Sequence, residues 1–140
     1  MRWAAAAVLI AACVPAEGPA MDPGENCQGC HGSGNQPLYQ GEERRHATDW
    51  TIAGTVFDVG DAGVEGAEVQ ITDSAGFSFS LRSNLAGNFY SKETVAFPLQ
   101  ACIARDGRTV CQESPVASGS CNACHNAASA QLPQAELIAP

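Results

Sequence analysis

The sequence predicts a mainly β protein: a small antiparallel β-sandwich of six or seven strands, with irregular segments at both ends. Three observations support this prediction. Short apolar and β-branched stretches recur through the middle of the chain, turn-forming residues separate them, and no long amphipathic helix interrupts the series. The length of 140 residues allows one modest domain with further segments on either side.

The expected strands follow one another through the middle segment, and several alternate between apolar and polar residues. They cover residues 51–57, 67–72, 77–82, 88–91, 99–105 and 108–112, and residues 93–97 would provide a seventh. Glycine with Asp or Asn separates most of them, as expected for tight turns. The candidate core consists of Val56, Val69, Ile71, Phe79, Leu81, Phe89, Leu99, Ile103 and Val110.

Asp106 and Gly107 suit a two-residue type I′ turn between the last two strands. Counting outward from that turn sets Cys102 opposite Cys111, at a non-hydrogen-bonded position where Cα atoms lie ~4.5 Å apart. This spacing is near the close limit for a disulfide, so we predict a Cys102–Cys111 bond. Two independent buried thiols are the alternative, which is less expected in an exported protein.

Three patterns in the middle segment have the form G-x-V-x-D, V-x-G-A-x-V and N-x-x-G-x-F. They consist of Gly54, Val56 and Asp58, then Val64, Gly66, Ala67 and Val69, and then Asn84, Gly87 and Phe89. In these residues the chain resembles the carboxypeptidase regulatory-like domains of the transthyretin-like sandwich group. The resemblance implies such a β-sandwich over residues 51–113, usually a structural or adhesive module, and implies little about activity.

The sequence C-x-x-C-H occurs twice, on either side of this sandwich segment. The two motifs consist of Cys27, Cys30 and His31, and of Cys121, Cys124 and His125. This pattern is the local signature of c-type haem attachment, in which both thiols join one porphyrin and the histidine binds its iron. We therefore expect two covalently bound haem c groups, with His31 and His125 as proximal ligands, in segments 27–50 and 114–140.

Other chemistries use C-x-x-C as well. One pair could be a redox couple, and the four cysteines together could form a Cys₄ zinc site. Two observations favour haem instead: histidine follows both pairs, and the pairs lie much farther apart than the roughly 15 to 20 residues of a zinc ribbon.

Two haem irons need four axial ligands, and the motif histidines supply only two. His46 is the remaining histidine of the chain, and we expect it to ligate one iron. A solvated surface histidine is the alternative. Met21 is then the only realistic internal sulfur for the other iron, which could otherwise stay open or be completed by a neighbouring molecule.

The composition limits the classes of partner. Seven Lys and Arg face 15 Asp and Glu, a net charge of −8, which argues against a nucleic-acid partner. An acidic carrier instead favours redox partner proteins with a basic docking face.

The amino-terminal residues indicate export. Residues 1–12 resemble a short signal peptide, and the sequence Ile-Ala-Ala-Cys ending at Cys13 looks like the lipobox of bacterial lipoproteins. Cys13 would then carry the lipid, with residues 13–26 as a flexible tether. Ordinary cleavage nearby, which discards Cys13, is the alternative. The expected location is the periplasm, the outer membrane as a lipoprotein, or the extracellular surface, with membrane contact through the lipid anchor only.

These features together predict a non-enzymatic electron carrier, an exported di-haem c-type cytochrome. Its flanking motifs would suit self-association into haem chains. The alternatives are a small di-haem peroxidase-like enzyme, which would need an open iron with acid and base groups, and a structural or adhesive module whose C-x-x-C pairs bind zinc. Six reversing strands begin and end at one pole of a sandwich, so we also expect the two haems to be neighbours.

Overall fold

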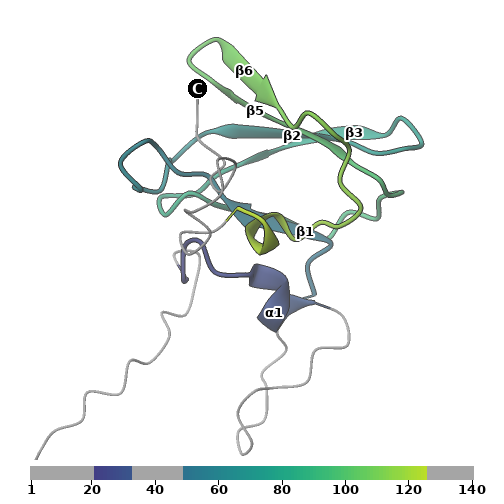
Figure 1. Cartoon of the computed structure of the whole chain (residues 1–140), viewed down its shortest axis with the longest axis horizontal. Helices are drawn as coiled ribbons and strands as arrows, with labels where there is room; N and C mark the ends of the chain where they lie inside the picture. Colours follow the sequence, from purple (N-terminus) through teal and green to yellow (C-terminus); the bar gives the residue numbers. More distant parts are fainter. Residues whose placement is uncertain (1–20, 33–48, 126–140) are drawn as a thin grey trace, which may run out of the picture.

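The computed structural model describes residues 21–32 and 49–125, apart from the side chain of Cys30. These residues form six strands in two antiparallel sheets (Figure 1), so the predicted β-sandwich class is confirmed. The strands are β1 (Ile52–Thr55), β2 (Glu68–Thr72), β3 (Ser78–Arg82), β4 (Asn88–Ser91), β5 (Gln100–Arg105) and β6 (Arg108–Cys111). A short helix, α1 (Cys27–His31), precedes them, and a 3₁₀ turn, η1 (Cys121–Ala123), follows. Cys13 and His46 lie outside the described residues.

One sheet has two strands, β1 and β4, and the other has four in the order β3-β2-β5-β6. Each strand lies inside the range expected from the sequence. β1 differs most from its expected range, because it covers Ile52–Thr55 where the sequence predicts residues 51–57. Residues 93–97 form no strand. No helix in the two described stretches is long and apolar enough to cross a bilayer.

The hairpin of β5 and β6 has the predicted register. Asp106 and Gly107 have φ values of 51° and 78°, both in the left-handed region that a type I′ turn requires. Ile103 pairs with Val110 and Cys102 with Cys111. The two Sγ atoms lie 2.09 Å apart, at disulfide distance, with the Cα atoms 3.9 Å apart.

The core lies between the two sheets and contains most of the predicted residues. Buried residues that pack together are Ile52, Val56, Val64, Ala67, Val69, Ile71, Phe89, Leu99 and Ile103, with Phe79 and Leu81 partly buried against them. The prediction for Val110 is wrong, because its side chain is 51% exposed. Val110 lies opposite the buried Ile103, and cross-strand partners share a face of the sheet. It therefore faces the core side, but β6 is the edge strand of its sheet and all four of its residues are exposed.

Several residues that carry the family resemblance have structural roles in this fold. The Asp58 carboxylate accepts hydrogen bonds from the N–H groups of Gly60 (2.8 Å) and Ala62 (3.0 Å), which lower its pKa and hold a turn. Gly87 has φ of 81°, and a Cβ there would lie 2.3 Å from the Val56 carbonyl oxygen. The patterns thus mark the tight turns that set the strand order.

Candidate functional site

Each C-x-x-C-H motif forms one helical turn. In α1, residues 27–31 are α-helical, and in η1 the N–H groups of Cys124 (3.2 Å) and His125 (2.9 Å) both donate to the Cys121 carbonyl oxygen. Residues i, i+3 and i+4 of a helical turn share one face. Both cysteines and the histidine of a motif therefore start from the same side of the backbone, as joint attachment of one porphyrin requires.

The fold brings the two motifs into direct contact, although the sandwich separates them in the sequence. The Asn122 amide Nδ2 donates to the Glu25 carbonyl oxygen at 2.8 Å and lies 3.9 Å from Cys27 Sγ. Ser120 Oγ lies 2.6 Å from Asn26 Oδ1. The two motif segments therefore lie next to each other, with α1 below β1 and η1 beside it (Figure 1). The separation of bound haems stays a prediction.

Both motifs are tied to β1 by the amide at their first x position. In the first motif, Gln28 Nε2 donates to the carbonyl oxygens of Trp50 (3.1 Å) and Thr51 (2.9 Å), just before β1 begins. In the second, Asn122 Oδ1 accepts from the Thr55 N–H (2.9 Å) and Nδ2 donates to Thr55 Oγ1 (3.0 Å), where β1 ends. The sequence pattern identifies neither amide, because the C-x-x-C-H motif leaves its x positions unspecified.

Asn122 belongs to a buried polar network around Thr55. Thr55 Oγ1 donates to Asn88 Oδ1 (2.8 Å) and accepts from the Gly24 N–H (2.9 Å), while Asn88 Nδ2 donates to the Met21 carbonyl oxygen (2.7 Å). Thr55, Asn88 and Asn122 are all buried. A fully bonded network in a low-dielectric interior is rigid, so it fixes the segment before Cys27 against β1 and β4.

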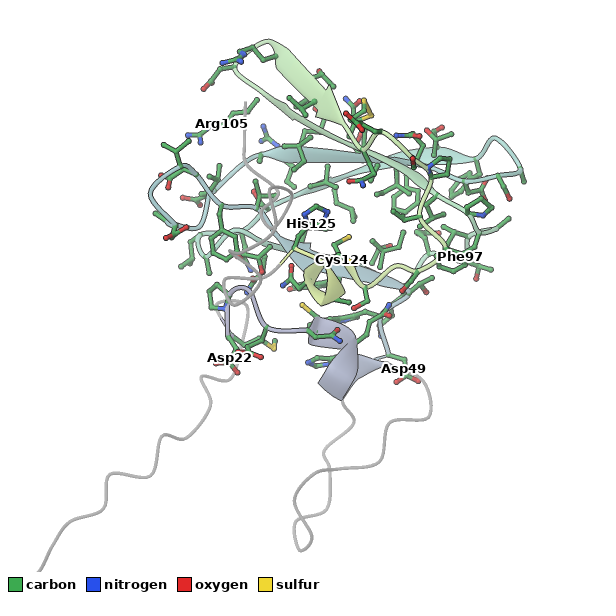
Figure 2. All side chains as sticks on the ribbon, in the orientation of Figure 1. Asp22, Asp49, Phe97, Arg105, Cys124 and His125 are labelled. Carbon is green, nitrogen blue, oxygen red and sulfur yellow. A yellow bond between two sulfur atoms is a disulfide. The ribbon has the colours of Figure 1, made fainter. Side chains whose placement is uncertain are left out.

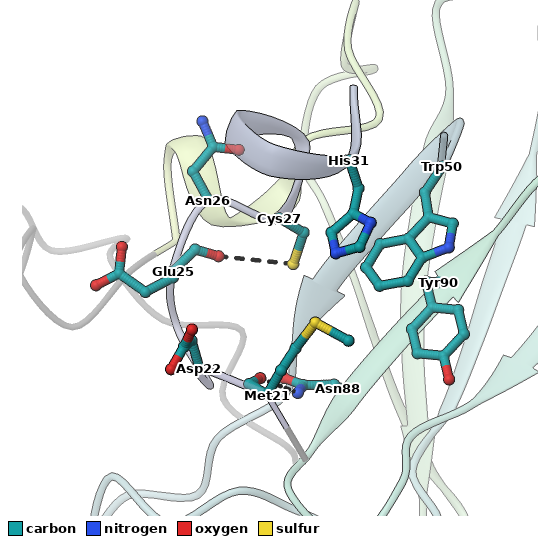
Figure 3. A pocket seen from close by; sticks show the side chains of 9 residues that line it. All are labelled: Met21, Asp22, Glu25, Asn26, Cys27, His31, Trp50, Asn88 and Tyr90. Atoms are coloured by element: carbon teal, nitrogen blue, oxygen red, sulfur yellow. Dashed lines mark hydrogen bonds between the residues drawn. The ribbon is translucent and has the colours of Figure 1, made fainter. Parts of the chain in front are cut away.

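The first motif borders a cavity of about 70 Å³ near the surface (Figure 3). Its walls include Met21, Cys27, His31, Trp50 and Tyr90. The His31 ring stacks on Trp50 with centroids 3.8 Å apart, and Trp50 stacks on Tyr90 at 4.3 Å. This volume is far below the roughly 300–1,000 Å³ of ligand pockets, so a porphyrin on Cys27 would lie largely outside the cavity. Met21 does lie near His31, as a sulfur ligand would require.

The second motif borders a much larger groove, of about 700 Å³. Three parts of the chain line it: the core-facing sides of the strands, the linker after β6, and the motif itself. Its apolar lining residues are Val69, Phe89, Ala101, Ile103, Val110, Val116, Ala117 and Ala123, and the motif contributes Cys121, Cys124 and His125. Figure 2 shows Cys124 and His125 between the two sheets. This volume lies within the range of cofactor pockets, so the residues fit a porphyrin attached here.

The Cys121 thiol is not an activated one. Burial first, and then the nearby Cys27 thiol, raise its pKa to about 12. Reactive redox cysteines instead have lowered pKa values, because the thiolate is the nucleophile. Cys121 therefore lacks the lowered pKa of the attacking cysteine in a C-x-x-C redox couple. Among the described side chains, which omit Cys30, no three His, Cys, Asp or Glu residues are grouped to hold a metal ion.

No protein-family model, curated protein or solved structure matches this chain. The likeness to carboxypeptidase regulatory-like domains therefore stands on the quoted residues and on the sandwich fold alone.

Proposed function

We propose that the chain is an exported di-haem c-type cytochrome that transfers electrons and catalyses no reaction of its own. The carrying observation is that the second motif lies against the first. Asn122 Nδ2 is 3.9 Å from Cys27 Sγ and bonds the carbonyl oxygen of Glu25, two residues before Cys27, at 2.8 Å. Two attachment motifs so far apart in sequence would need no such contact if each acted independently. Covalent haem supplies one-electron redox chemistry, and the protein tunes it through ligands, burial and hydrogen bonds.

The chain's own residues have separate roles in this proposal. Cys27, Cys30, Cys121 and Cys124 would hold two haems, and His31 and His125 would be the proximal iron ligands. Gln28 and Asn122 position the two motifs at opposite ends of β1. The rigid network around Thr55 then keeps the spacing of the motifs constant, which favours direct exchange between neighbouring centres.

The remaining ligands and the cellular location are part of the same proposal. His46 would complete one iron, and Met21 is the candidate sulfur for the other. Lipid on Cys13 would anchor the protein at a bacterial membrane or cell surface. An acidic net charge of −8 favours redox partners with a basic docking face.

Mass spectrometry of the exported, full-length protein tests the central claim. We expect the mass of two haems, lipid on Cys13 and an intact Cys102–Cys111 bond. Cys27→Ser with Cys30→Ser, and Cys121→Ser with Cys124→Ser, should each remove one haem. A protein that binds zinc and no haem would refute the proposal.

Circular dichroism in the Soret region tests whether the haems are adjacent. The intact protein should give a split, bisignate band that each single-haem variant loses. Two simple, additive bands would contradict side-by-side haems while leaving the di-haem assignment intact.

Spectroscopy of His46→Ala tests the ligand assignment. Loss of a strong sixth ligand should make one haem high-spin and raise its potential, and unchanged spectra would remove His46 from the ligand set. Carbon monoxide binding by the unmodified protein would indicate an open iron, which the peroxidase-like alternative requires.

A further inference from the structure

The groove beside the second motif continues the hydrophobic core. Val69, Phe89 and Ile103 are core residues, buried to 5% exposure or less, and all three also line the groove. Val110 lies opposite Ile103 on the same face of the sheet but is 51% exposed. The apolar row of the larger sheet thus extends beyond what the two-stranded sheet covers.

A second wall of the groove comes from the linker between β6 and η1. Val116 bridges to Leu99 through two backbone hydrogen bonds of 2.8 Å, which hold the linker in place. Val116 and Ala117 add apolar surface, and the polar lining residues of this linker are Gln112, Glu113, Ser114, Ser118 and Ser120. The groove therefore has an apolar sheet wall and a mixed linker wall, which suits a flat, mainly apolar ligand with a polar edge.

The second motif closes one side of the groove. Cys121, Cys124 and His125 all line it. η1 is held against β1 because Asn122 bonds Thr55 and the Ala53 N–H donates to the Gly119 carbonyl oxygen at 2.9 Å. A group attached to these residues therefore starts at the groove. The first motif borders only the cavity of about 70 Å³.

We propose that the porphyrin on Cys121 and Cys124 lies in this groove and completes the sandwich core, covering Val110. This inference rests on the proposed di-haem function. It assigns unequal roles to the cofactors: the second is part of the fold, whereas the first is peripheral. It also accounts for an apolar Val110 on the core face of an uncovered edge strand.

Opposite charges placed in the groove test the inference. The haem-loaded Cys27→Ser, Cys30→Ser protein carries only the second haem, and Val110→Asp and Val110→Lys are made in that background. A nearby negative charge stabilises the ferric state and a positive charge the ferrous state. The reduction potential should therefore fall with Asp and rise with Lys. Ala117→Asp and Ala117→Lys, on the linker wall, should shift it in the same directions.

Val59 supplies the matched control, since it is 88% exposed and does not line the groove. Val59→Asp and Val59→Lys should leave the potential unchanged, because solvent screens exposed charges. The inference would be overturned if charges at Val110 and Ala117 shifted the reduction potential no more than charges at Val59. The groove would then have another occupant, such as residues 126–140. A protein without haem in the mass spectrum would instead refute the proposed function itself.

Discussion

The two C-x-x-C-H motifs share a sequence pattern, a helical turn and an amide that binds β1, yet their surroundings differ. The first motif lies on α1 at the outer face of the two-stranded sheet, beside a cavity of about 70 Å³ and a stack of His31, Trp50 and Tyr90. The second lies between the sheets, beside a groove of about 700 Å³. Two copies of one short motif therefore have different surroundings, because the fold decides how much of each motif is enclosed.

The two positioning amides differ in the same way. Gln28 is partly buried and bonds two carbonyl oxygens, whereas Asn122 is only 1% exposed and uses both its oxygen and its nitrogen. Removing a buried hydrogen-bonding group leaves its partners unsatisfied, which costs more than removing a partly exposed one. Substitutions at the two positions should therefore have unequal effects.

The largest effect is expected for Asn122→Leu. The buried Thr55 N–H would lose its acceptor, which costs about 1–3 kcal/mol, and Thr55 Oγ1 and the Glu25 carbonyl oxygen would each lose one donor, at about 1 kcal/mol each. The free energy of unfolding should therefore fall by about 4 kcal/mol. For a domain of this size that corresponds to a fall in Tm of more than ~15 °C. Thermal denaturation followed by circular dichroism measures it. Soret coupling between the haems should weaken as well.

Asn26→Leu is the matched control, because Asn26 bonds Ser120 and so links the residues just before the two motifs, but is exposed. It should cost no more than about 1 kcal/mol. Equal losses for the two variants would mean that burial of Asn122 contributes nothing to holding the motifs together.

The second prediction concerns the disulfide at the hairpin beside the groove. The Cys102–Cys111 bond closes a short loop, with a sequence separation of 9. Its removal should therefore cost less than the ~3 kcal/mol given for a 15-residue loop. Cys102→Ser with Cys111→Ser should melt at a lower temperature yet retain two haems by mass. Loss of one haem would show that the hairpin is needed for attachment at the second motif.

The fold and the hairpin were predictable because their signals are local. Alternating strands, glycine turns and the Asp106-Gly107 pair specify pairing between neighbours in sequence, so the register and the Cys102–Cys111 contact follow from counting. The proposed haem-attachment residues depend on an equally local signal, since the C-x-x-C-H pattern itself contains them.

The exposure of Val110, the role of Asn122 and the groove could not be predicted from the sequence. They depend on packing between segments that are distant in the chain, and no local pattern indicates such packing. Val110 has the alternation of a core residue, but its exposure depends on the width of the opposite sheet. The role of Asn122 arises only when β1, Glu25 and η1 come together. The groove likewise depends on where the linker after β6 crosses between the sheets, and nothing in its sequence of small and polar residues sets that path.

Gln28→Ala should have a smaller effect, of about 1 kcal/mol, since two partly exposed carbonyl oxygens can bond water instead. The change should loosen the first motif alone. A spectral shift should therefore appear in the Cys121→Ser, Cys124→Ser protein, which keeps only the first haem. It should be absent from the Cys27→Ser, Cys30→Ser protein, which keeps only the second. Gln70→Ala is the control, because Gln70 bonds only Glu68 of its own strand among the described contacts. A shift confined to the second haem would contradict the separate roles of the two amides.

The smallest effect, and the only stabilising one, is expected for Gly29→Ala, which gives the first motif the residue that Ala123 supplies in the second. A Cβ at Gly29 would meet nothing within 4 Å, and alanine in a helix is favoured over glycine by roughly 0.5–1 kcal/mol. The free energy of unfolding should therefore rise by about that amount, measured by denaturant titration of the haem-loaded protein.

Gly54→Ala is the contrasting control: its Cβ would lie 2.7 Å from both Cys121 Cβ and Phe89 Cζ, and overpacking of this kind costs about 1–3 kcal/mol. If Gly29→Ala also destabilised the protein, the first motif would be as tightly enclosed as the second, and the contrast between a peripheral and an enclosed site would fail.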